Sequence, residues 1–403
     1  MPWKDCSPMT LRQEFVILAS SGGENMTGLC ERFGISRKTG YKWLARYRQK
    51  GIEGLENGSR QPKSSPTKTA DAMEQAVLEL RHQQPAWGGR KLHHRLKMLG
   101  HKKVPASSTI TNILHRHQLI DPAESLKHKA CQRFEHEEPN DLWQMDFKGH
   151  FAMVNSDRCH PLTILDDHSR FSLGLRACAN ERGTTVQQEM IELFRRYGLP
   201  RRMLMDNGSP WGSDVFHPYT PLTAWLMRLG IRVSHGRPYH PQTQGKEERF
   251  HRTLKAELLR GREFKDLQDC QSRFDPWRDI YNLERPHQAL DMKTPASRYR
   301  CSETPYPESL PAIEYGPDDK VRQVASQGEI SLEGKRYVIS KAFRGYPIGL
   351  RPTVDDGYFD VYFCSHKIGC LDARGELGRS DAFALPHFAR CARSVRQGES
   401  EKP

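Results

Sequence analysis

The spacing of hydrophobic residues changes twice along the chain. Up to about residue 121, apolar positions recur at helical intervals, as in LRQEFVILAS (11–20) and DAMEQAVLEL (71–80). From about residue 141 they gather in short runs such as WQMDF, and beyond residue 312 short apolar runs alternate with Gly- and Asp-containing turns. Because a period of 3.6 indicates helix and short apolar runs indicate strand, the pattern predicts three regions of different architecture.

The first 50 residues contain short helical segments separated by a glycine. MTGLCERFG ends at Gly34, and the next helix is expected to begin after Ser36, whose hydroxyl suits an N-cap. Helix, glycine-containing turn and helix are typical of a helix-turn-helix module, although a small bundle without a ligand has the same spacing. The residues expected to pack inward are Ile35, Tyr41, Trp43 and Leu44. Those left to face a DNA groove and its phosphates are Arg37, Lys38, Thr39 and Lys42.

Two stretches poor in hydrophobic residues divide the N-terminal third. Residues 51–69 are rich in Gly, Pro, Ser and Lys, and residues 122–140 are polar and charged, so both are predicted to be linkers. Between them, residues 70–121 contain three helical segments, the last opening near Ser107. We expect a second helix-turn-helix module here, with or without a wing. Two tethered modules would gain effective concentration on one DNA site.

Residues 141–300 have the pattern of an α/β domain. Three β-type segments (WQMDFKGHFAMV, HPLTILDD and FSLGLRAC) precede a helix at about 183–197. Two further strands, RRMLMDN and IRVSH, alternate with helices. The order βββαβαβα predicts a mixed five-strand sheet flanked by helices. Residues 312–390 are expected to form a small all-β barrel, and residues 391–403 a disordered tail.

Composition and charge narrow the class of protein. No apolar run approaches the ~18 residues of a membrane-spanning helix, and MPWKDCSPMT lacks a secretory signal pattern. The ten cysteines are scattered without a C-x-x-C pair, so we expect reduced thiols in the cytoplasm. Of the net charge of +13, residues 1–130 carry +11, residues 131–300 carry +3 and residues 301–403 carry −1. A basic module joined to near-neutral ones favours a nucleic-acid partner for the basic part.

Three acidic residues of the central region are candidates for catalysis. Two lie on or next to apolar strands, where burying a charge is costly, and the third belongs to a helical pattern that suits phosphate chemistry. Asp146 lies within the strand WQMDF, and Asp206 ends the apolar run RRMLMD. A buried carboxylate needs a partner, and a divalent metal is a good one. On a helix from about residue 245, Glu248, Arg252 and Lys255 share one face, which suits a metal ligand followed by phosphate contacts.

Structural interpretations of these acids remain open. Asp206 begins DNG, a turn signal, and the stripe from Glu248 also suits a solvated salt-bridged face. Glu247 lies on the neighbouring face and competes with Glu248. Asp166 and Asp167 are an alternative acidic pair, but the sequence TILDDHSR favours a hairpin turn there.

The three acids and their flanking residues resemble a known family. DNGS follows Asp206, and HPQTQGKEERFHRTLK surrounds Glu248, as in the catalytic core of integrases. More closely, the chain resembles bacterial insertion-sequence transposases of the DDE type. LWQMDFKG, DDHSRF and NLERPHQALDMKTPASRY add to this resemblance, which covers roughly residues 10–300.

The resemblance implies an RNase H-like core that cleaves DNA and transfers the cut strand. It implies Mg²⁺ as the cofactor, with Mn²⁺ able to substitute, because paired ions activate the attacking oxygen and stabilise the leaving one. Asp146, Asp206 and Glu248 would be the catalytic residues and metal ligands. Residues matching positions that contact DNA ends are Gln244, Arg252 and Lys255. The implied partner is double-stranded DNA, both at the ends of the element and at the target. A homo-oligomer is expected to bind this DNA, and no membrane is involved. The expected location is the bacterial cytoplasm and nucleoid.

Two other functions fit part of the sequence. A domesticated, non-catalytic DNA-binding regulator needs only the N-terminal modules, whereas all three acids are present here. A nuclease of the same fold would cut without joining, but two helix-turn-helix modules favour recognition of specific ends. We therefore expect a DNA transposase whose non-specific DNA attraction resides mainly in residues 1–130.

Overall fold

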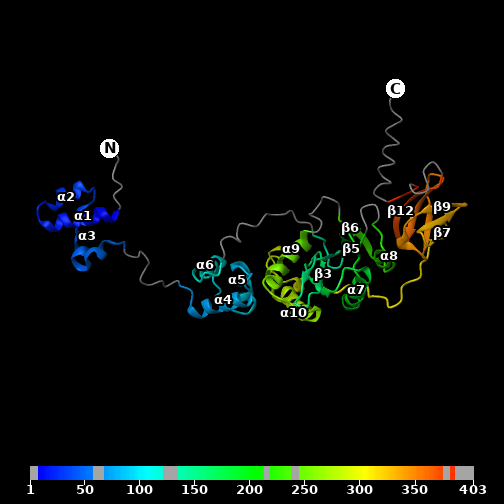
Figure 1. Ribbon diagram of the computed structural model, residues 1–403, viewed down its shortest axis with the longest axis horizontal. Coiled ribbons are helices and arrows are strands. Elements are labelled where there is room, and N and C mark those ends of the chain that lie inside the picture. Colours follow the sequence, from blue (N-terminus) through cyan, green and yellow to red (C-terminus); the bar gives the residue numbers. More distant parts are fainter. Residues whose placement is uncertain are drawn as a thin grey trace, which may run out of the picture. The chain divides into compact units, whose positions relative to one another are not determined.

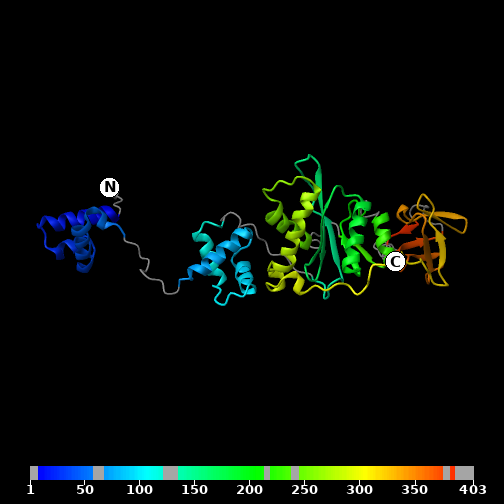
Figure 2. The same cartoon turned by 90° about the horizontal axis from the view of Figure 1, so that it is seen from below.

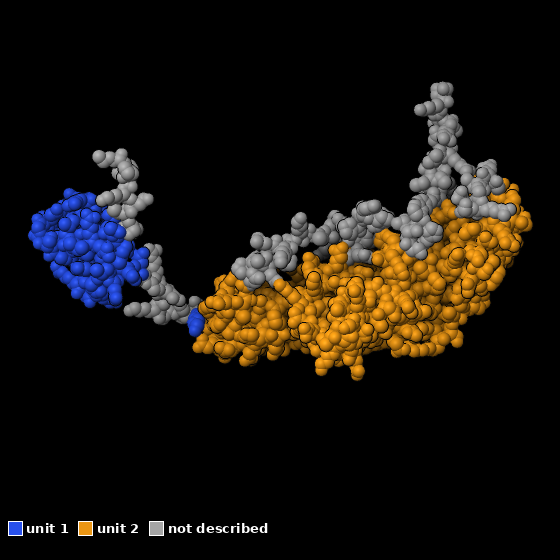
Figure 3. All heavy atoms as spheres, viewed as in Figure 1, with its two compact units in different colours: residues 1–68 blue, residues 69–403 orange. Residues whose placement is uncertain are grey.

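The computed structural model describes residues 8–57, 68–120, 135–212, 218–236, 245–374 and 382–385. The chain divides into two compact units, residues 1–68 and 69–403, which Figure 3 colours separately. In the described ranges no helix is both long and apolar enough to cross a bilayer. The expected tail 391–403, and Gln244, lie outside the described residues.

The first unit is a three-helix module (Figure 1). Its helices are α1 (Pro8–Ser21), α2 (Met26–Arg32) and α3 (Arg37–Lys50). The predicted cap is present, because the Ser36 hydroxyl accepts a hydrogen bond from the Thr39 backbone N–H at 3.2 Å. A Cβ on Gly40 would lie 2.7 Å from Cys30 Sγ, so the glycine allows α3 to pack closely on α2. Tyr41, expected inside, is 51% exposed, whereas Trp43 and Leu44 are buried.

The first module extends beyond the boundary expected at residue 50. Gly51–Leu55, which we expected to begin a linker, is a 3₁₀ turn packed on the helices. Leu55 is fully buried, and Arg12 Nη1 donates to its carbonyl oxygen at 2.8 Å. The Gly- and Pro-rich composition predicted a linker here, because Leu55 is the single apolar residue that anchors the segment. Residues 58–67 of the expected linker lie outside the described residues.

The second three-helix module belongs to the larger unit. Its helices are α4 (Asp71–Gln83), α5 (Gly89–Met98) and α6 (Ser107–Arg116). Their apolar faces enclose a separate core that includes Val77, Trp87 and Ile110. Gly89 stands at the crossing of α5 and α6, where a Cβ would lie 2.4 Å from Thr111 Oγ1. Residues 68–120 contain no strand, so this described part shows a module without a wing.

The central domain has the mixed sheet expected from the sequence. Its strands are β1 (Trp143–Phe147), β2 (Phe151–Ala152), β3 (Arg158–Asp166), β4 (Ser172–Cys178), β5 (Arg202–Met205) and β6 (Arg232–His235). The order is β4-β3-β1-β5-β6, with the two-residue β2 paired to the start of β3. β1 and β4 run antiparallel to β3, whereas β1, β5 and β6 run parallel to one another.

Helices cover both faces of this sheet (Figure 2). They are α7 (Gly183–Tyr197), α8 (Pro221–Arg228), α9 (Gly245–Leu254) and α10 (Leu267–Asp279). α7 and α8 pack on one face through Leu193 and Leu226, and α9 and α10 on the other through Phe250 and Phe274. The last turns of α9 and α10 widen into π-helical segments at Lys255–Leu259 and Ile280–Glu284. This is the RNase H-like arrangement that the sequence predicted.

The core begins earlier than expected. Residues 135–140, assigned from sequence to a linker, pack on the central domain. Asn140 is buried, its backbone N–H donates to Asp166 Oδ1 at 2.7 Å, and its side chain accepts from Trp143 Nε1 at 3.0 Å. The charged composition misled here, because Glu135 pairs with Arg298 at 2.7 Å instead of facing solvent alone.

The C-terminal domain is all-β. Its strands are β7 (Lys320–Gln323), β8 (Glu329–Leu332), β9 (Lys335–Val338), β10 (Pro347–Pro352), β11 (Tyr358–Phe363), β12 (His366–Asp372) and β13 (Phe383–Ala384). They form a five-stranded sheet, β13-β12-β11-β10-β7, and the hairpin β8-β9 around one apolar core. The described pairings do not close into a ring, so the expected barrel is an open one in the described ranges.

Helix α8 joins this domain to the central one. Its residues Leu222 and Trp225 face the central core, while Ala224 and Met227 belong to the apolar core of the β domain. His366 Nε2 lies 3.1 Å from the Met227 carbonyl oxygen, which adds a polar contact across the same boundary. The helix is therefore buried on two sides.

Candidate active site and DNA-contacting surfaces

Asp146 and Asp206 come from neighbouring parallel strands. Asp146 is the penultimate residue of β1, and Asp206 directly follows β5. Partial burial raises the pKa of Asp146 to about 7, and the negative charge of Asp206 adds to this rise. The structure therefore brings together two of the three acids singled out in the sequence.

Asp206 also makes the turn that its sequence predicts. Its Oδ1 accepts a hydrogen bond from the Gly208 N–H at 3.1 Å, and Asn207 Nδ2 donates to the Gly236 carbonyl oxygen at 2.8 Å. Burial raises the pKa of Asp206, while the Gly208 N–H opposes that rise. One carboxylate oxygen is thus used to shape the turn, and the turn fixes the carboxyl group at the end of the sheet.

The third acid is where sequence and structure are hardest to reconcile. Glu247 lies on the inner face of α9 with Phe250 and Leu254 and is 1% exposed, whereas Glu248 is exposed. Burial raises the pKa of Glu247 well above its ordinary value, and the charge of Asp146 contributes. The buried Glu247 therefore interacts electrostatically with Asp146. Glu248, Arg252 and Lys255 are all exposed, as their shared face predicts.

Thr163 and His251 hold the Glu247 carboxyl in place. Thr163 Oγ1 lies 3.0 Å from Glu247 Oε2, 2.8 Å from His251 Nε2 and 2.9 Å from the Asp146 carbonyl oxygen. Burial lowers the pKa of His251 to about 3, so this imidazole is neutral at pH 7. Glu247 Oε1 is buried without a hydrogen-bond partner among the described residues. This network attaches α9 to β1 and β3.

Glu181 is a nearby acid that the sequence reasoning missed. Its charge raises the pKa of both Asp146 and Asp206, so it lies close to the two carboxyl groups. It precedes α7, and its Oε1 lies 2.8 Å from His160 Nδ1. The segment ACANERG gave no indication of this placement, since the proximity depends on how α7 packs.

The oxygen ligands that Asp146 and Asp206 offer suit a divalent cation. In the described part of the chain, no group of three His, Cys, Asp or Glu side chains is placed to surround one ion. Burial, and after it the charge of Asp206, raise the pKa of Asp146, so holding this carboxylate ionised there has an electrostatic cost. A cation between the two carboxyl groups would offset that cost, and hard carboxylate oxygens are ligands that Mg²⁺ accepts.

The alternative pair Asp166 and Asp167 has structural partners. Asp166 Oδ2 accepts hydrogen bonds from the Ser169 N–H at 2.8 Å and the Ser169 hydroxyl at 2.6 Å, which is the turn that the sequence favoured. Asp167 is buried as well, and Lys246 Nζ lies 2.5 Å from its Oδ1. The carboxyl groups of both residues are therefore occupied by structural partners.

The residues predicted to contact DNA in the first module form an exposed basic face. Arg37, Lys38 and Lys42 are exposed on α3, and Lys42 Nζ lies 4.9 Å from the centre of the Trp43 ring. Thr39 differs from them, because its hydroxyl lies 2.9 Å from Ser36 Oγ within the helix cap. Three of the four predicted side chains are thus presented to solvent, and the fourth shapes the start of the helix.

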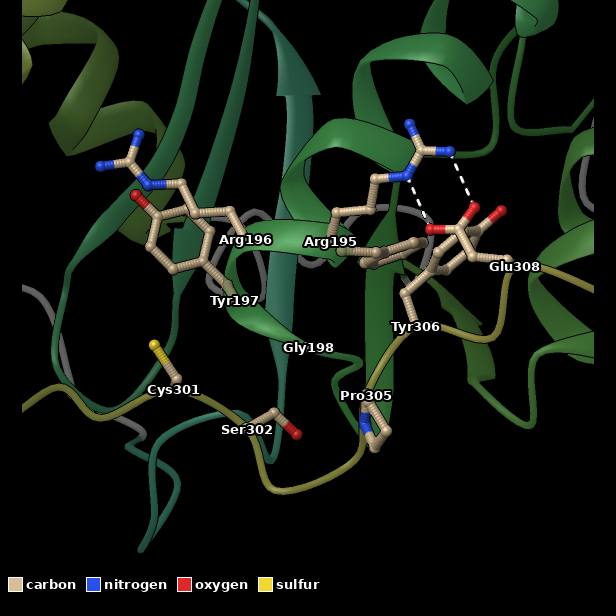
Figure 4. A pocket seen from close by; sticks show the side chains of 10 residues that line it. Arg195, Arg196, Tyr197, Gly198, Cys301, Ser302, Pro305, Tyr306 and Glu308 are labelled. Carbon is tan, nitrogen blue, oxygen red and sulfur yellow. Dashed lines mark hydrogen bonds and ion pairs between the residues drawn. The ribbon is translucent and has the colours of Figure 1, made fainter.

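A surface hollow lies at the C-terminal end of α7 (Figure 4). It has a volume of about 410 Å³ and is lined by the C-terminal end of α7 and by residues 301–308. Arg195 points to Glu308, with which it makes two hydrogen bonds of 2.9 and 2.8 Å. Because Glu181 precedes the other end of the 15-residue α7, the hollow lies about 20 Å from the acidic site along that helix.

Family comparisons match successive parts of the chain. Two models described as "Integrase core domain" match residues 136–241 and 229–295. "IS481 family transposase, C-terminal domain" matches residues 319–377. "Helix-turn-helix domain" matches residues 11–63, and "Homeodomain-like domain" matches residues 39–114. These matches follow the order of domains seen in the structure.

Individual relatives come from bacterial insertion elements. An uncharacterized 39.2 kDa protein of insertion element IS476 from Xanthomonas euvesicatoria is 26% identical over 280 residues, covering 68% of this chain and 78% of that protein. An uncharacterized 31.7 kDa protein of insertion element IS407 from Burkholderia multivorans is 23% identical, covering 62% of this chain and 90% of that protein.

One solved structure that is similar to this chain is that of the simian T-cell lymphotropic virus intasome in complex with PP2A regulatory subunit B56 gamma. The alignment covers 71% of this chain and 91% of the matched chain. The TM-score is 0.37 and the sequence identity is 15%. The family matches, and not this distant superposition, carry the assignment. With helix-turn-helix modules, an integrase core and an IS481-type C-terminal domain in sequence, the chain is a relative of bacterial insertion-sequence transposases built around an integrase-like core.

Proposed function

We propose that this protein is a DNA transposase that binds the ends of an insertion element and catalyses metal-dependent strand cleavage and strand transfer. The observation that carries the proposal is the pairing of Asp146 and Asp206 at the ends of parallel strands β1 and β5, beside α9. Burial raises the pKa of both carboxyl groups, and the charge of Asp206 adds to the rise at Asp146. Such perturbed acids in close pairs are typical of a functional site.

The third catalytic residue that we propose is Glu248. Glu247 is sealed from solvent and bonded to Thr163, so it cannot meet a DNA phosphate without rearrangement of the inner face of α9. Glu248 is exposed on the same helical turn, next to the competing residue. A metal ligand that must also leave open positions for substrate is better supplied from the exposed side.

The chain's residues supply binding and orientation. When bound, Mg²⁺, or Mn²⁺ in its place, provides Lewis-acid activation of the attacking oxygen and stabilisation of the leaving one. Asp146, Asp206 and Glu248 would be its ligands. The turn at Asp206 and the Thr163 contacts fix the elements that present these carboxyl groups. Neutral His251 fills the space beside Asp146, with 3.9 Å between its Nδ1 and Asp146 Oδ2, without adding charge.

The proposed reaction needs no covalent enzyme intermediate. Water attacks a phosphorus at the element end, and the bond from phosphorus to the 3′ oxygen breaks. The 3′ oxygen leaves with the electron pair and gains a proton. The resulting 3′-OH then attacks a target phosphodiester, forming a new bond to phosphorus while the original bond to the target's 3′ oxygen breaks. Because water and DNA supply the nucleophiles, the chain needs no serine or tyrosine nucleophile.

The surrounding parts are proposed to bind duplex DNA. Arg37, Lys38 and Lys42 would contact phosphates and base edges in the groove, with Thr39 setting the start of their helix. Arg252 and Lys255, exposed beyond Glu248, would contact the element end, and Gln244 is assigned there from the sequence. Synapsis of two ends would require a homo-oligomer, and the expected place of action is the bacterial cytoplasm and nucleoid.

The test is cleavage and joining of a labelled duplex carrying one end of the encoding element, with MgCl₂ or MnCl₂. Asp146→Asn, Asp206→Asn and Glu248→Gln are expected to lower cleavage by at least about 10³-fold, since each removes a ligand of the catalytic metal. Glu247→Gln is expected to keep activity, because glutamine has the same shape as the buried glutamate and keeps an oxygen that can accept from Thr163. Glu263→Gln, an exposed acid after α9, is the matched control.

The outcomes separate the competing functions. Cleavage without joining by the wild-type protein would favour a nuclease, and end binding without cleavage would favour a regulator. Loss of activity in Glu247→Gln together with an active Glu248→Gln would move the third ligand to Glu247. Full activity of the Asp146 variant would overturn the proposed function.

A further inference from the structure

Asp167 joins three separate segments of the central domain. Its Oδ1 accepts a hydrogen bond from Gln144 Nε2 at 2.7 Å and lies 2.5 Å from Lys246 Nζ. Its Oδ2 accepts from the His136 backbone N–H at 2.9 Å. The carboxylate is 4% exposed and the Lys246 side chain 17% exposed. Both carboxylate oxygens are therefore satisfied by donors from distant parts of the chain.

The partners of Asp167 adjoin the proposed catalytic residues. Gln144 precedes Asp146 by two positions on β1, so the two side chains lie on the same face of that strand. Lys246 is the second residue of α9 and precedes Glu248 by two positions. Lys246 Nζ also donates to the Asp167 carbonyl oxygen at 3.3 Å. One carboxylate thus connects the strand that carries Asp146 to the first turn of the helix that carries Glu248.

Helix stability does not account for Lys246. A cation in the first turn of a helix opposes the helix dipole, which favours negative charge there. A buried ion pair is also weak evidence for stability, since desolvation of both charges offsets much of their attraction. What the pair does provide is a fixed relative position, because a short ionic contact is more directional than apolar packing.

We propose that Asp167 and Lys246, with Gln144, are positioning residues that fix the start of α9 relative to β1. The proposal rests on the proposed function, since the carboxyl groups that it aligns are those of Asp146 and Glu248. Neither Asp167 nor Lys246 contacts the reacting atoms. Loss of the pair would leave both acids present but misaligned.

The experiment uses Asp167→Asn, Lys246→Met, their double variant and Lys246→Arg in the full chain. The single variants are expected to lower cleavage at saturating end duplex by ~10- to 100-fold, the usual cost of losing an outer-shell partner. The dissociation constant for the duplex should stay unchanged, and the rise in melting temperature produced by MnCl₂ should shrink. The double variant should lose no more than either single one, since the residues act as a unit. Lys246→Arg should recover part of the rate.

A matched control separates positioning from folding. Glu257→Gln alters another buried acid with cationic partners, located at the far end of α9. This variant should lower the stability of the protein. Its cleavage rate, measured well below the melting temperature, should not change. If Lys246→Met weakens duplex binding while Asp167→Asn has no effect, Lys246 is a direct DNA contact and the proposal is overturned.

The remaining outcomes distinguish this proposal from the proposed function. Folded and fully active Asp167→Asn and Lys246→Met proteins, with an inactive Asp146→Asn protein, overturn the positioning pair alone. An active Asp146→Asn protein overturns both.

Discussion

The two helical modules have similar architectures but use their basic residues differently. Each has three helices, its own apolar core and a glycine where two helices cross. In the first, Arg37, Lys38 and Lys42 are exposed. In the second, Lys91 Nζ lies 3.9 Å from Glu257 Oε1 of the central domain, and Arg95 Nη2 lies 2.5 Å from Glu284 Oε2.

The difference shows that basic charge in a DNA-binding module is not all available to DNA. Helix α5 faces the π-helical segments that end α9 and α10, and Ile280 of the second segment packs on the apolar core of the module. Glu257 is bonded to Arg285 Nε at 2.9 Å, so the contact is a network and not a single pair. The +11 charge of residues 1–130 therefore overstates the charge offered to phosphates.

Removing the first module should have the largest effect. A chain beginning at Thr69 is expected to lose most of its salt-dependent affinity for duplex DNA, by about 10²-fold or more at physiological salt, because several phosphate contacts are lost together. The measurement is the slope of log binding constant against log salt concentration. An unchanged slope would place the phosphate contacts in the larger unit and reverse the comparison.

Breaking the contact of the second module with the central domain should come next. Glu257→Ala leaves Lys91 and Arg285 in a buried site without their shared acid, and is expected to lower the free energy of unfolding by about 3 kcal/mol. Urea unfolding of the full chain measures it. The matched control is Glu24→Ala, which breaks the exposed pair with Arg32 in the first module and should change that free energy by less than about 0.5 kcal/mol.

Lys91 should make the stability of the second module depend on pH. Burial lowers the pKa of Lys91 to about 7 from an ordinary value of 10.5, and the nearby cations Arg285 and Arg249 add to this, against Glu257. Between these pH values the unfolded chain binds more protons than the folded one, so stability rises with pH. From pH 7 to 9 the wild type should gain about 1 kcal/mol relative to Lys91→Met, since the side chain is still one-quarter exposed. Parallel pH profiles of the two proteins would show that Lys91 is already solvated.

The smallest expected effect is that of one exposed base in the first module. Lys38→Ala should weaken duplex binding by less than about tenfold and lower the salt slope by about 1, without changing the melting temperature. Lys91→Met should do the opposite, changing the melting temperature and leaving the salt slope intact. Equal effects of the two substitutions on the slope would mean that both modules present their bases to DNA.

Local patterns predicted most of the fold. Alternation and short apolar runs gave the order of strands and helices in the central domain, and the turn signal after Asp206 and the cap at Ser36 are both present. These features depend on neighbours in sequence, and so they are readable from it. The meeting of Asp146 and Asp206 depends on the fold that the family resemblance implies, in which the strands that carry them are neighbours.

What the sequence could not give depends on packing between distant elements. Glu247 shares the i, i+3, i+7 spacing of the buried residues Phe250 and Leu254, but an acidic side chain gives no reason to expect burial. The sequence around Asp167 predicts only a turn, whereas its ionic partner Lys246 lies 79 residues further along the chain. The contact of Lys91 with Glu257 joins two domains, and no local signal marks either residue.

Helix α8 has a consequence for how such proteins can diversify. Because Ala224 and Met227 are buried by the β domain and Leu222 and Trp225 by the central sheet, α8 belongs to both hydrophobic interiors. A C-terminal domain exchanged between relatives would meet a helix shaped for another partner. A protein that acquires this domain by recombination is therefore expected to have compensating substitutions in α8. The first module is a separate compact unit, so its exchange needs no such compensation.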